Sequence, residues 1–463
     1  MATPLHIVVL AAGQGSRMKS SLPKVLHSLA GQPLLHHVLE SARGLRPDGL
    51  HVVIGHGAEQ VREMTPQTDI QWVIQTERLG TGHAVAQALP GIPDTARVLV
   101  LYGDVPLTGT STLSRLADAI SRDALALLTV KLSDPTGYGR ILRDTRGIVS
   151  GIVEQKDATA EQLGITEVNT GLLGAPAERL KQWLPSLSSD NAQGEYYLTD
   201  AIALARADGL SVAVAQPDEP EEVQGVNDRI QLAALERWCQ RREARRLMAE
   251  GATLADPERV EIRGHVETGQ DVMIDVNAVM EGEVVLGDRV RIGPGVVLRN
   301  CRIGSDVQVD AHSVVEGARV HRGAVIGPFA RLRPDAVVGR DARVGNFVEI
   351  KKSSIGAGSK VNHLSYVGDT TMGEGVNVGA GTITCNYDGT SKHHTTVHNG
   401  AFIGSNTSLV APLTLGERSL VGAGSTVTRD VGNRELAVAR GRQRNIPEWV
   451  NADDETDSEQ GGS

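Results

Sequence analysis

The chain has 463 residues, of which 40% are hydrophobic and 22% are charged. This balance is typical of a folded globular protein, and the length excludes a single small domain, since domains average about 150 residues. The formal net charge of -10 and the lack of a long basic stretch disfavour a nucleic-acid partner.

The first part of the chain alternates short apolar runs with longer mixed segments. Runs rich in β-branched residues predict strands over 6–10, 51–55, 70–75, 96–104, 124–130 and 210–215. Such alternation is typical of an α/β domain with a mostly parallel sheet. The sequence therefore predicts a Rossmann-like α/β domain over residues 1–228. Residues 229–250 contain no Gly or Pro, and they predict a linking helix.

From residue 251 to residue 450 the pattern changes to a period of six. Aliphatic residues recur at this spacing in three runs: Ile274, Met280, Leu286, Ile292, Leu298; Ile326, Leu332, Val338, Val344, Ile350; and Ile403, Leu409, Leu415, Val421, Val427. Gly often follows the aliphatic residue, and a small residue often stands four positions after it. One short strand and one corner of a parallel β-helix take six residues, so the pattern predicts a β-helix of hexapeptide repeats.

The repeat breaks once, between about Ile383 and Phe402, where the polar segment TCNYDGTSKHHTTVHN intrudes. A polar insertion in a solenoid projects outward, and such loops commonly lie on the working face. The acidic tail over 451–463 is expected to be disordered.

Three cysteines, Cys239, Cys301 and Cys385, lack the CxxC spacing of a zinc or dithiol site. We expect them to be reduced thiols in a cytoplasmic protein. The sequence shows no basic leader before the first apolar run and no run of about 18 apolar residues, so it predicts no export signal and no membrane partner.

The segment LAAGQGSRMKSSLPK follows the first predicted strand. Backbone N–H groups freed at a Gly-rich turn bind phosphate oxygens, and Arg17 and Lys24 can neutralise them. The spacing matches neither a Walker A loop nor a complete dinucleotide fingerprint, and a turn used only for chain reversal is the alternative. Asp104 follows a predicted buried strand, where a carboxylate suits Mg²⁺, although a turn or helix-capping role is common for Asp.

The predicted β-helix carries polar residues that a structural coil does not need. They are Arg333, Lys351, His363, Tyr366, Asn377, Asn386 and Tyr387. An imidazole has an ordinary pKa near 6.5, which suits a general base, and Lys351 and Arg333 could bind a phosphate. The alternative for His363 is an ordinary exposed surface histidine.

Motifs in chain order resemble those of one family. They are LAAGQGSRM with LPK, QTERLGTGHA, YGDVPL, DPTGYGR, EVNTG, GEYYLTD and GVNDR, then RLRP, VGNFVEIKKS, HLSYVGD, NVGAGTITCNYDG and TRDV with Arg440. This series resembles the bacterial bifunctional N-acetylglucosamine-1-phosphate uridyltransferases/glucosamine-1-phosphate acetyltransferases. The resemblance implies a left-handed β-helix, a cytoplasmic homotrimer, and synthesis of UDP-N-acetylglucosamine for peptidoglycan and lipopolysaccharide.

The resemblance also implies a uridyltransferase site that takes UTP and the sugar phosphate. Its implied residues are Leu10, Ala11, Ala12, Gly13, Arg17, Lys24, Gln75, Gly80, Thr81, Tyr102, Gly103, Asp104, Gly139, Glu154, Asn169 and Asn227. Among them, Asp104 and Asn227 are implied to bind Mg²⁺. Gln14 departs from the family pattern, because it stands where a basic residue is common.

For the acetyltransferase, the resemblance implies His363 as the catalytic base. Arg333, Lys351, Tyr366 and Asn377 are implied to bind glucosamine-1-phosphate, and Ala380, Asn386, Tyr387, Ser405, Ala423 and Arg440 to bind acetyl-CoA. The acidic tail after Trp449 departs from the family pattern. Two other hypotheses remain open at this point: a nucleotidyltransferase whose β-helix is structural or regulatory, and a non-catalytic assembly subunit.

Overall fold

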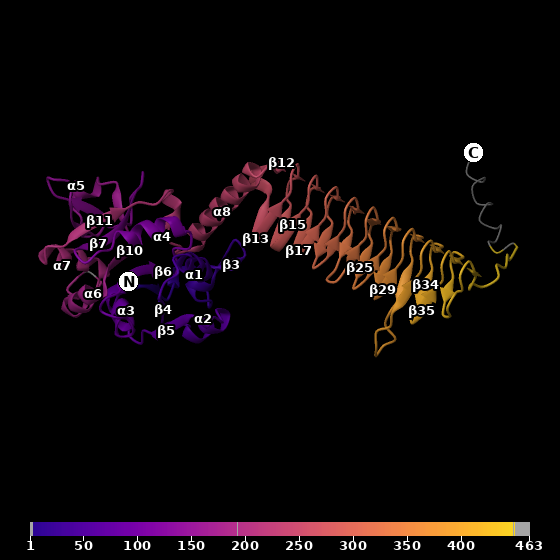
Figure 1. Cartoon of the computed structure of the whole chain (residues 1–463), viewed down its shortest axis with the longest axis horizontal. Coiled ribbons are helices and arrows are strands. Elements are labelled where there is room, and N and C mark those ends of the chain that lie inside the picture. Colours follow the sequence, from indigo (N-terminus) through magenta and orange to yellow (C-terminus); the bar gives the residue numbers. More distant parts are fainter. Residues whose placement is uncertain (1–2, 192, 448, 450–463) are drawn as a thin grey trace, which may run out of the picture. The chain divides into compact units, whose positions relative to one another are not determined.

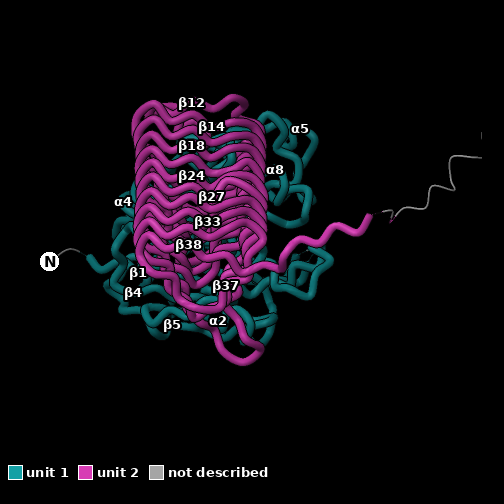
Figure 2. Tube along the Cα trace, turned by 90° about the vertical axis from the view of Figure 1, so that its right-hand side faces the viewer, with its two compact units in different colours: residues 1–243 teal, residues 244–463 magenta. Residues whose placement is uncertain are grey.

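The computed structural model describes residues 3–191, 193–447 and 449, so the predicted tail over 451–463 lies outside the described residues. The chain divides into two compact units, residues 1–243 and 244–463 (Figure 2). Among the described residues, no helix is both long and apolar enough to cross a membrane.

Unit 1 is built on a nine-stranded sheet in the order β11-β7-β10-β6-β1-β4-β5, with β8 paired to β10 and β9 to β8 (Figure 1). The strands are β1 Leu5–Ala11, β4 Gly49–Ile54, β5 Ile70–Ile74, β6 Arg97–Tyr102, β7 Ala124–Lys131, β8 Arg140–Arg143, β9 Val149–Val153, β10 Glu167–Pro176 and β11 Ser211–Ala215. β1 pairs in parallel with both β4 and β6, whereas β10 is antiparallel to β6 and β7. The expected mostly parallel α/β sheet is confirmed.

Helices cover both faces of this sheet. The helices of unit 1 are α1 Leu34–Gly44, α2 Ala58–Met64, α3 Thr81–Ala88, α4 Thr110–Asp118, α5 Ala160–Leu163, α6 Ala177–Trp183 and α7 Ala201–Ala207. Successive side chains of a strand point to opposite faces of the sheet, so β1 contributes to two hydrophobic cores. Ile7 and Val9 pack in the core with α1, α2 and α4. Val8 and Leu10 pack in the core with α3, α6 and α7. This layering fixes the carboxyl end of β1 in the middle of the sheet.

All six runs predicted as strands in this unit form β1, β4, β5, β6, β7 and β11. The sequence analysis missed β8, β9 and β10. The longest of these, β10, contains the bend at Gly171, where φ is 87° and the register with β7 shifts. Because the polar NTG segment marks that bend, the strand resembles a loop when it is read from the sequence alone.

Two buried histidines lie next to each other at the amino-terminal side of the sheet. His6 on β1 and His51 on β4 approach to 3.0 Å between Nδ1 and Nε2. Burial and, to a lesser extent, the charge of the neighbouring His6 together lower the pKa of His51 to about 4. Burial also lowers the pKa of His6, although the Asp48 carboxylate opposes this shift.

We expect this pair to make unit 1 sensitive to acid. A depressed pKa means that the unfolded chain takes up protons first, so the free energy of unfolding falls as the pH drops below about 6.5 and continues to fall towards pH 4, by up to about 3 kcal/mol for His51. Urea unfolding followed by tryptophan fluorescence at about pH 7.5 and pH 5 measures the loss. His51→Asn should show a smaller difference between the two pH values, and an equal difference would contradict the prediction.

Unit 2 is a left-handed parallel β-helix with three faces. Face 1 holds β12 Thr253–Leu254, β14 Met273–Ile274, β16 Arg291–Ile292, β18 Gln308–Val309, β21 Val325–Ile326, β24 Arg343–Asn346, β27 Lys360–His363, β30 Asn377–Val378, β33 Phe402–Ile403, β36 Leu420–Val421 and β38 Leu436–Ala437. Face 2 holds β19 Val314–Glu316, β22 Arg331–Leu332, β25 Glu349–Lys351, β28 Tyr366–Gly368, β31 Ile383–Cys385, β34 Ser408–Val410 and β37 Thr426–Val427.

Face 3 holds β20 Arg319–Val320, β23 Val337–Val338, β26 Ser354–Ile355, β29 Thr370–Met372, β32 Thr395–Val397 and β35 Leu413–Leu415. The longer strands β13 Glu261–Thr268, β15 Val279–Leu286 and β17 Val297–Ile303 belong to the sheet that joins faces 2 and 3. Each coil passes from face 1 to face 2 and then to face 3. Every aliphatic residue of the six-residue pattern is buried in one continuous core, which confirms the predicted β-helix.

The insertion in the repeat is shorter than expected. The sequence predicted a break over about 383–402, but Ile383–Cys385 forms β31 and Thr395–Val397 forms β32, each paired within the coil stack. Only residues 386–394 project from the coil, because Thr384 and Val397 still place their side chains in the interior. This projecting segment is called the 386–394 loop below.

Helix α8, Arg229–Ala249, begins in unit 1 and ends in unit 2, just before the first coil. Leu235 and Cys239 pack with Met18 and Leu29 of unit 1. Further along the helix, Ala244 and Leu247 belong to the core of unit 2. The helix therefore contributes buried side chains to two separate hydrophobic cores.

Candidate active sites

A cavity of about 730 Å³ opens in unit 1 at the carboxyl ends of β1 and β6. Eleven of the residues implied for the uridyltransferase line it: Leu10, Ala11, Ala12, Gly13, Arg17, Lys24, Gln75, Gly80, Thr81, Tyr102 and Asp104. They come from strand ends and loops because open α/β sheets leave a crevice at this edge. These eleven residues, which the resemblance implies, therefore line one cavity.

Lys24 is the centre of the polar contacts in this cavity. Its ammonium pairs with the Asp104 carboxylate and donates a hydrogen bond to Asn227 Oδ1 at 3.4 Å. Arg17 Nη2 donates to the same Asn227 oxygen at 2.9 Å. The oxygen atoms of Asp104 and Asn227 thus point at one place, where the Lys24 ammonium lies. Such oxygen donors suit Mg²⁺, so the two side chains fit the ion.

Within the described residues, no three His, Cys, Asp or Glu side chains cluster in a way that could hold a metal ion. A Mg²⁺ ion at Asp104 and Asn227 would therefore take its other ligands from water and from substrate phosphates, as is usual for this ion. The ion would supply positive charge to a reacting phosphoryl group.

Gly139, Glu154 and Asn169, three of the five other residues implied for this half, form a second cluster near Tyr102. Asn169 N–H donates to Gly139 O at 2.9 Å, and a Cβ at Gly139 would lie 3.2 Å from Glu154 Oε1. Gly171 packs so closely on the ring of Tyr102 that a Cβ there would lie 2.9 Å from it. Burial raises the pKa of Glu154, and the Asp157 and Asp200 carboxylates raise it further. Gly103 follows Tyr102 directly, and its N–H donates to Leu10 O.

Five lining residues of the cavity were not among the implied site residues. They are Gln14, Val25, Arg78, Ala84 and Glu195. Arg78 stands inside the QTERLGTGH segment that drew attention at Gln75 and Gly80, so its position offered a signal. Glu195 comes from a distant loop, and no local pattern places it here.

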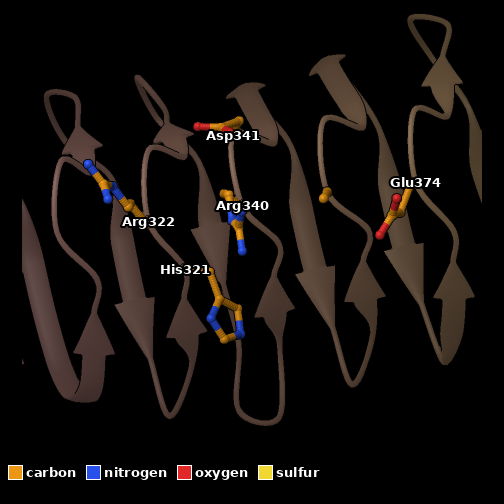
Figure 3. Close-up of a pocket in the computed structure, with 6 residues that line it drawn as sticks. His321, Arg322, Arg340, Asp341 and Glu374 are labelled. Carbon is orange, nitrogen blue, oxygen red and sulfur yellow. The ribbon is translucent and has the colours of Figure 1, made fainter.

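Another cavity, of about 1060 Å³, lies in unit 2, at the turns that lead from face 3 back to face 1. His321, Arg322, Arg340, Asp341 and Glu374 extend from successive coils around it (Figure 3). None of the implied site residues lines this cavity, and charges of both signs surround it. Cavity size alone therefore does not identify an active site in this unit.

His363 ends β27, at the turn from face 1 to face 2. Register places it opposite Asn346 of the preceding coil, and its Nδ1 lies 2.9 Å from Asn346 Oδ1. An amide oxygen only accepts, so Nδ1 carries the proton and Nε2 keeps its lone pair. In the part of the chain that the structure describes, Nε2 has no hydrogen-bond partner. The imidazole is thereby set up to accept a proton at an exposed nitrogen.

Four of the six residues implied for acetyl-CoA binding stack along this same edge. Asn406 N–H donates to Ala380 O at 2.7 Å, and Gly424 N–H donates to Ser405 O at 2.8 Å in the next coil. Arg440 Nη1 donates to Ala423 O at 2.7 Å. The four implied residues Ala380, Ser405, Ala423 and Arg440 therefore form one row on consecutive coils beyond His363, although they are spread over 61 positions of the sequence.

A basic cluster lies at the turns that follow face 2. Lys351 is close enough to Lys392 of the 386–394 loop that the hydrogen bond and charge of Lys351 lower the pKa of Lys392. Two neighbouring lysine side chains favour an anion at this place. Arg333 donates to Glu349 at 3.0 Å nearby. The sequence analysis missed Lys392, because the loop brings it beside Lys351 only in three dimensions.

Polar side chains of the next coils adjoin this cluster. Asn386 Nδ2 donates to the Asp369 carboxylate, and Tyr366 Oη lies 3.5 Å from the same amide nitrogen. The Tyr387 hydroxyl, on the projecting loop, donates to Gly389 O at 2.6 Å, and its side chain is exposed. Asn377 does not join this group, because it begins β30 on face 1, whereas Tyr366 lies on face 2.

Comparison with known proteins identifies both halves of the chain. Residues 7–155 match the MobA-like NTP transferase domain, and residues 265–300 and 317–352 match the bacterial transferase hexapeptide (six repeats). Bifunctional protein GlmU of Marinobacter nauticus is 61% identical over 447 residues, which cover 96% of this chain and 98% of that protein.

The proteins of the same name from Stutzerimonas stutzeri and Idiomarina loihiensis are 58% and 55% identical, each over 445 residues that cover 96% of this chain and 98% of theirs. These matches cover nearly the whole of each chain and therefore include both units. The chain therefore belongs to the GlmU family of bifunctional transferases, the uridyltransferase/acetyltransferase family that its motifs resemble.

Proposed function

We propose that unit 2 acetylates glucosamine-1-phosphate with acetyl-CoA and that unit 1 then transfers UMP from UTP to N-acetylglucosamine-1-phosphate. In the first reaction the amine forms a C–N bond to the acetyl carbon, coenzyme A leaves as the thiol, and the amine gives up a proton. In the second, a sugar phosphate oxygen bonds to the α-phosphorus of UTP, and pyrophosphate leaves. The product is UDP-N-acetylglucosamine.

One observation favours two catalytic sites over a β-helix with a purely structural role. His363 presents an unpartnered Nε2 within the described structure, and Asn346 fixes its tautomer. A structural coil needs neither feature. The Lys351–Lys392 pair on a nearby edge supplies positive charge for the sugar phosphate.

In unit 1 the chain's own side chains do most of the positioning. Lys24 and Arg17 neutralise phosphate oxygens beside the Gly-rich turn, and Asp104 with Asn227 would hold Mg²⁺. Tyr102, Gly139, Glu154 and Asn169 would contact the sugar.

Omission of single substrates tests the proposal. The protein is incubated with glucosamine-1-phosphate, acetyl-CoA, UTP and Mg²⁺, and each component is left out in turn. We expect coenzyme A release to need only the sugar phosphate and acetyl-CoA, and pyrophosphate release to need all four. Pyrophosphate release from N-acetylglucosamine-1-phosphate, together with no coenzyme A release from glucosamine-1-phosphate and acetyl-CoA, would support the structural β-helix instead.

We also propose a homotrimer in the cytoplasm. Phe329, Phe347 and Leu364 form an exposed apolar row beside His363, with ring centroids 5.4 Å apart for the two phenylalanines. Asn377 lies on another face from Tyr366, so a neighbouring copy would complete the sugar-phosphate site, and closed symmetry makes such sites equivalent. Three unpaired cysteines suit a reducing compartment.

Light scattering of a Phe347→Asp variant tests the trimer. A charge in the apolar row should dissociate the assembly, so we expect a smaller species that loses acetyl transfer and keeps uridylyl transfer. Ile230→Asp, on the exposed side of α8, is the matched control and should stay trimeric. A monomeric protein with full acetyltransferase activity would contradict both the trimer and the shared site.

We further propose that residues 1–228 form the uridyltransferase domain, 229–250 the linking helix and 251–450 the acetyltransferase domain. Separate cores on either side of α8 support this division. A fragment of residues 1–250 should transfer UMP to N-acetylglucosamine-1-phosphate at a rate close to that of the whole chain. A folded but inactive fragment would show that the boundary or the site is wrong.

A further inference from the structure

Arg78 lies at the rim of the nucleotide cavity, on the segment between β5 and α3. Its guanidinium is exposed, and Nη1 donates to Gln14 Oε1 at 2.9 Å. Gln14 belongs to the Gly-rich turn that follows β1. This contact therefore holds the Arg78 guanidinium beside the turn that is expected to bind phosphate.

Arg78 differs from Arg17 and Lys24, the other two cations of the cavity, in the partner that its side chain contacts. Lys24 is paired with the Asp104 carboxylate, and Arg17 is bonded to Asn227 beside it. The partner of Arg78 is a neutral amide, and in the described part of the chain it forms no ion pair. Its positive charge is thus available to an incoming anion, and its second guanidinium nitrogen is free to donate.

The order of the strands places Arg78 and the Lys24–Asp104 pair on opposite sides of β1. β6, which precedes Asp104, lies on one side of β1, whereas β4 and then β5, which precedes Arg78, lie on the other. The sugar-side residues, Tyr102 and Asn169, belong to β6 and β10. Attacking and leaving oxygens are roughly in line in phosphoryl transfer, so a sugar on the β6 side directs the leaving group towards Arg78.

We propose that Arg78 binds the phosphoryl groups of the nucleoside triphosphate that leave as pyrophosphate, and that Gln14 positions it. This inference rests on the proposed uridyltransferase reaction in unit 1. Arg78 binds through charge-assisted hydrogen bonds to phosphate oxygens, while Lys24 and Arg17 serve the phosphate at the reacting centre.

Steady-state kinetics of Arg78→Gln in the full-length protein tests this role. We expect the KM for UTP to rise about tenfold, since a charged hydrogen bond is lost, with a smaller change in kcat. In the reverse reaction the KM for pyrophosphate should rise similarly, whereas the KM for UDP-N-acetylglucosamine should stay within about twofold of wild type. Arg122→Gln, an exposed arginine of unit 1 outside the cavity, is the matched control.

A charge-relocation variant separates binding from a structural role. In Gln14→Lys/Arg78→Gln an ammonium replaces the lost guanidinium at the same contact, so we expect the KM for UTP and for pyrophosphate to recover most of the loss. Failure of the double variant to recover, or equal increases in KM for pyrophosphate and UDP-N-acetylglucosamine, would overturn the inference. Absence of uridylyl transfer in the wild-type protein would instead overturn the proposed function.

Discussion

The Asp104→Asn variant is expected to lose uridylyl transfer by about 10³-fold while coenzyme A release continues at the wild-type rate. Asn has nearly the same shape as Asp, so the cavity should keep its form. What is lost is the negative charge that pairs with Lys24 and that would bind Mg²⁺ with Asn227. Without it, charge developing on the reacting phosphoryl group is poorly stabilised, since positioning and electrostatics supply most of this catalysis.

Pyrophosphate and coenzyme A release are measured on the same preparation of this variant. Asp123→Asn, an exposed carboxylate of unit 1 outside the cavity, is the matched control and should behave like wild type. A readout independent of turnover is the thermal stabilisation that Mg²⁺ and UTP give together, which should disappear in Asp104→Asn. Full uridyltransferase activity in the variant would show that Asp104 has no such role.

For His363→Ala we expect acetyl transfer to fall by about 10² to 10⁴, the usual contribution of a positioned base. The amine attacks the thioester only when unprotonated, and it sheds a proton as the C–N bond forms. Nε2 of His363 takes that proton because Asn346 engages Nδ1. Lysine and arginine side chains ordinarily stay charged near pH 7 and suit the sugar phosphate better.

Saturating acetyl-CoA and conditions in which chemistry limits the rate make this measurement decisive. Added imidazole should restore part of the activity, since the truncated side chain leaves space for it. His398→Ala, an exposed histidine at another corner of the β-helix, is the matched control. A loss below about tenfold would mean that another group accepts the proton or that the amine already enters neutral.

The β-helix was predictable from the sequence because its rule is local. A large aliphatic side chain points inward once in each six-residue step, so the spacing of Leu332, Val338 and Val344 is enough to predict the coil. The same holds for the Gly-rich turn, whose position after an apolar run specifies its place at a strand end. Local rules also pointed to Arg17, Lys24 and Asp104, whereas the family resemblance implied most of the other residues that line the cavity in unit 1.

Residues that meet through long-range pairing were not predictable in this way. Lys392 reaches Lys351 only because the 386–394 loop returns to an earlier coil, and Asn346 reaches His363 only through coil register. The faces of the β-helix decide that Asn377 is separate from Tyr366, and periodicity alone assigns no side chain to a shared site. The proposed role of Arg78 likewise depends on its contact with Gln14, which the sequence alone does not predict.

The row formed by Ala380, Ser405, Ala423 and Arg440 has a consequence for the mechanical behaviour of the β-helix. Coils in a solenoid are stabilised mainly by their nearest neighbours, so the terminal coils open at the lowest free-energy cost. The row runs along these last coils. A molecule bound along several coils would stabilise all of them, because it would have to dissociate before any one of these coils opens. Binding of acetyl-CoA along this row, as proposed, would therefore raise the free energy needed to open the terminal coils.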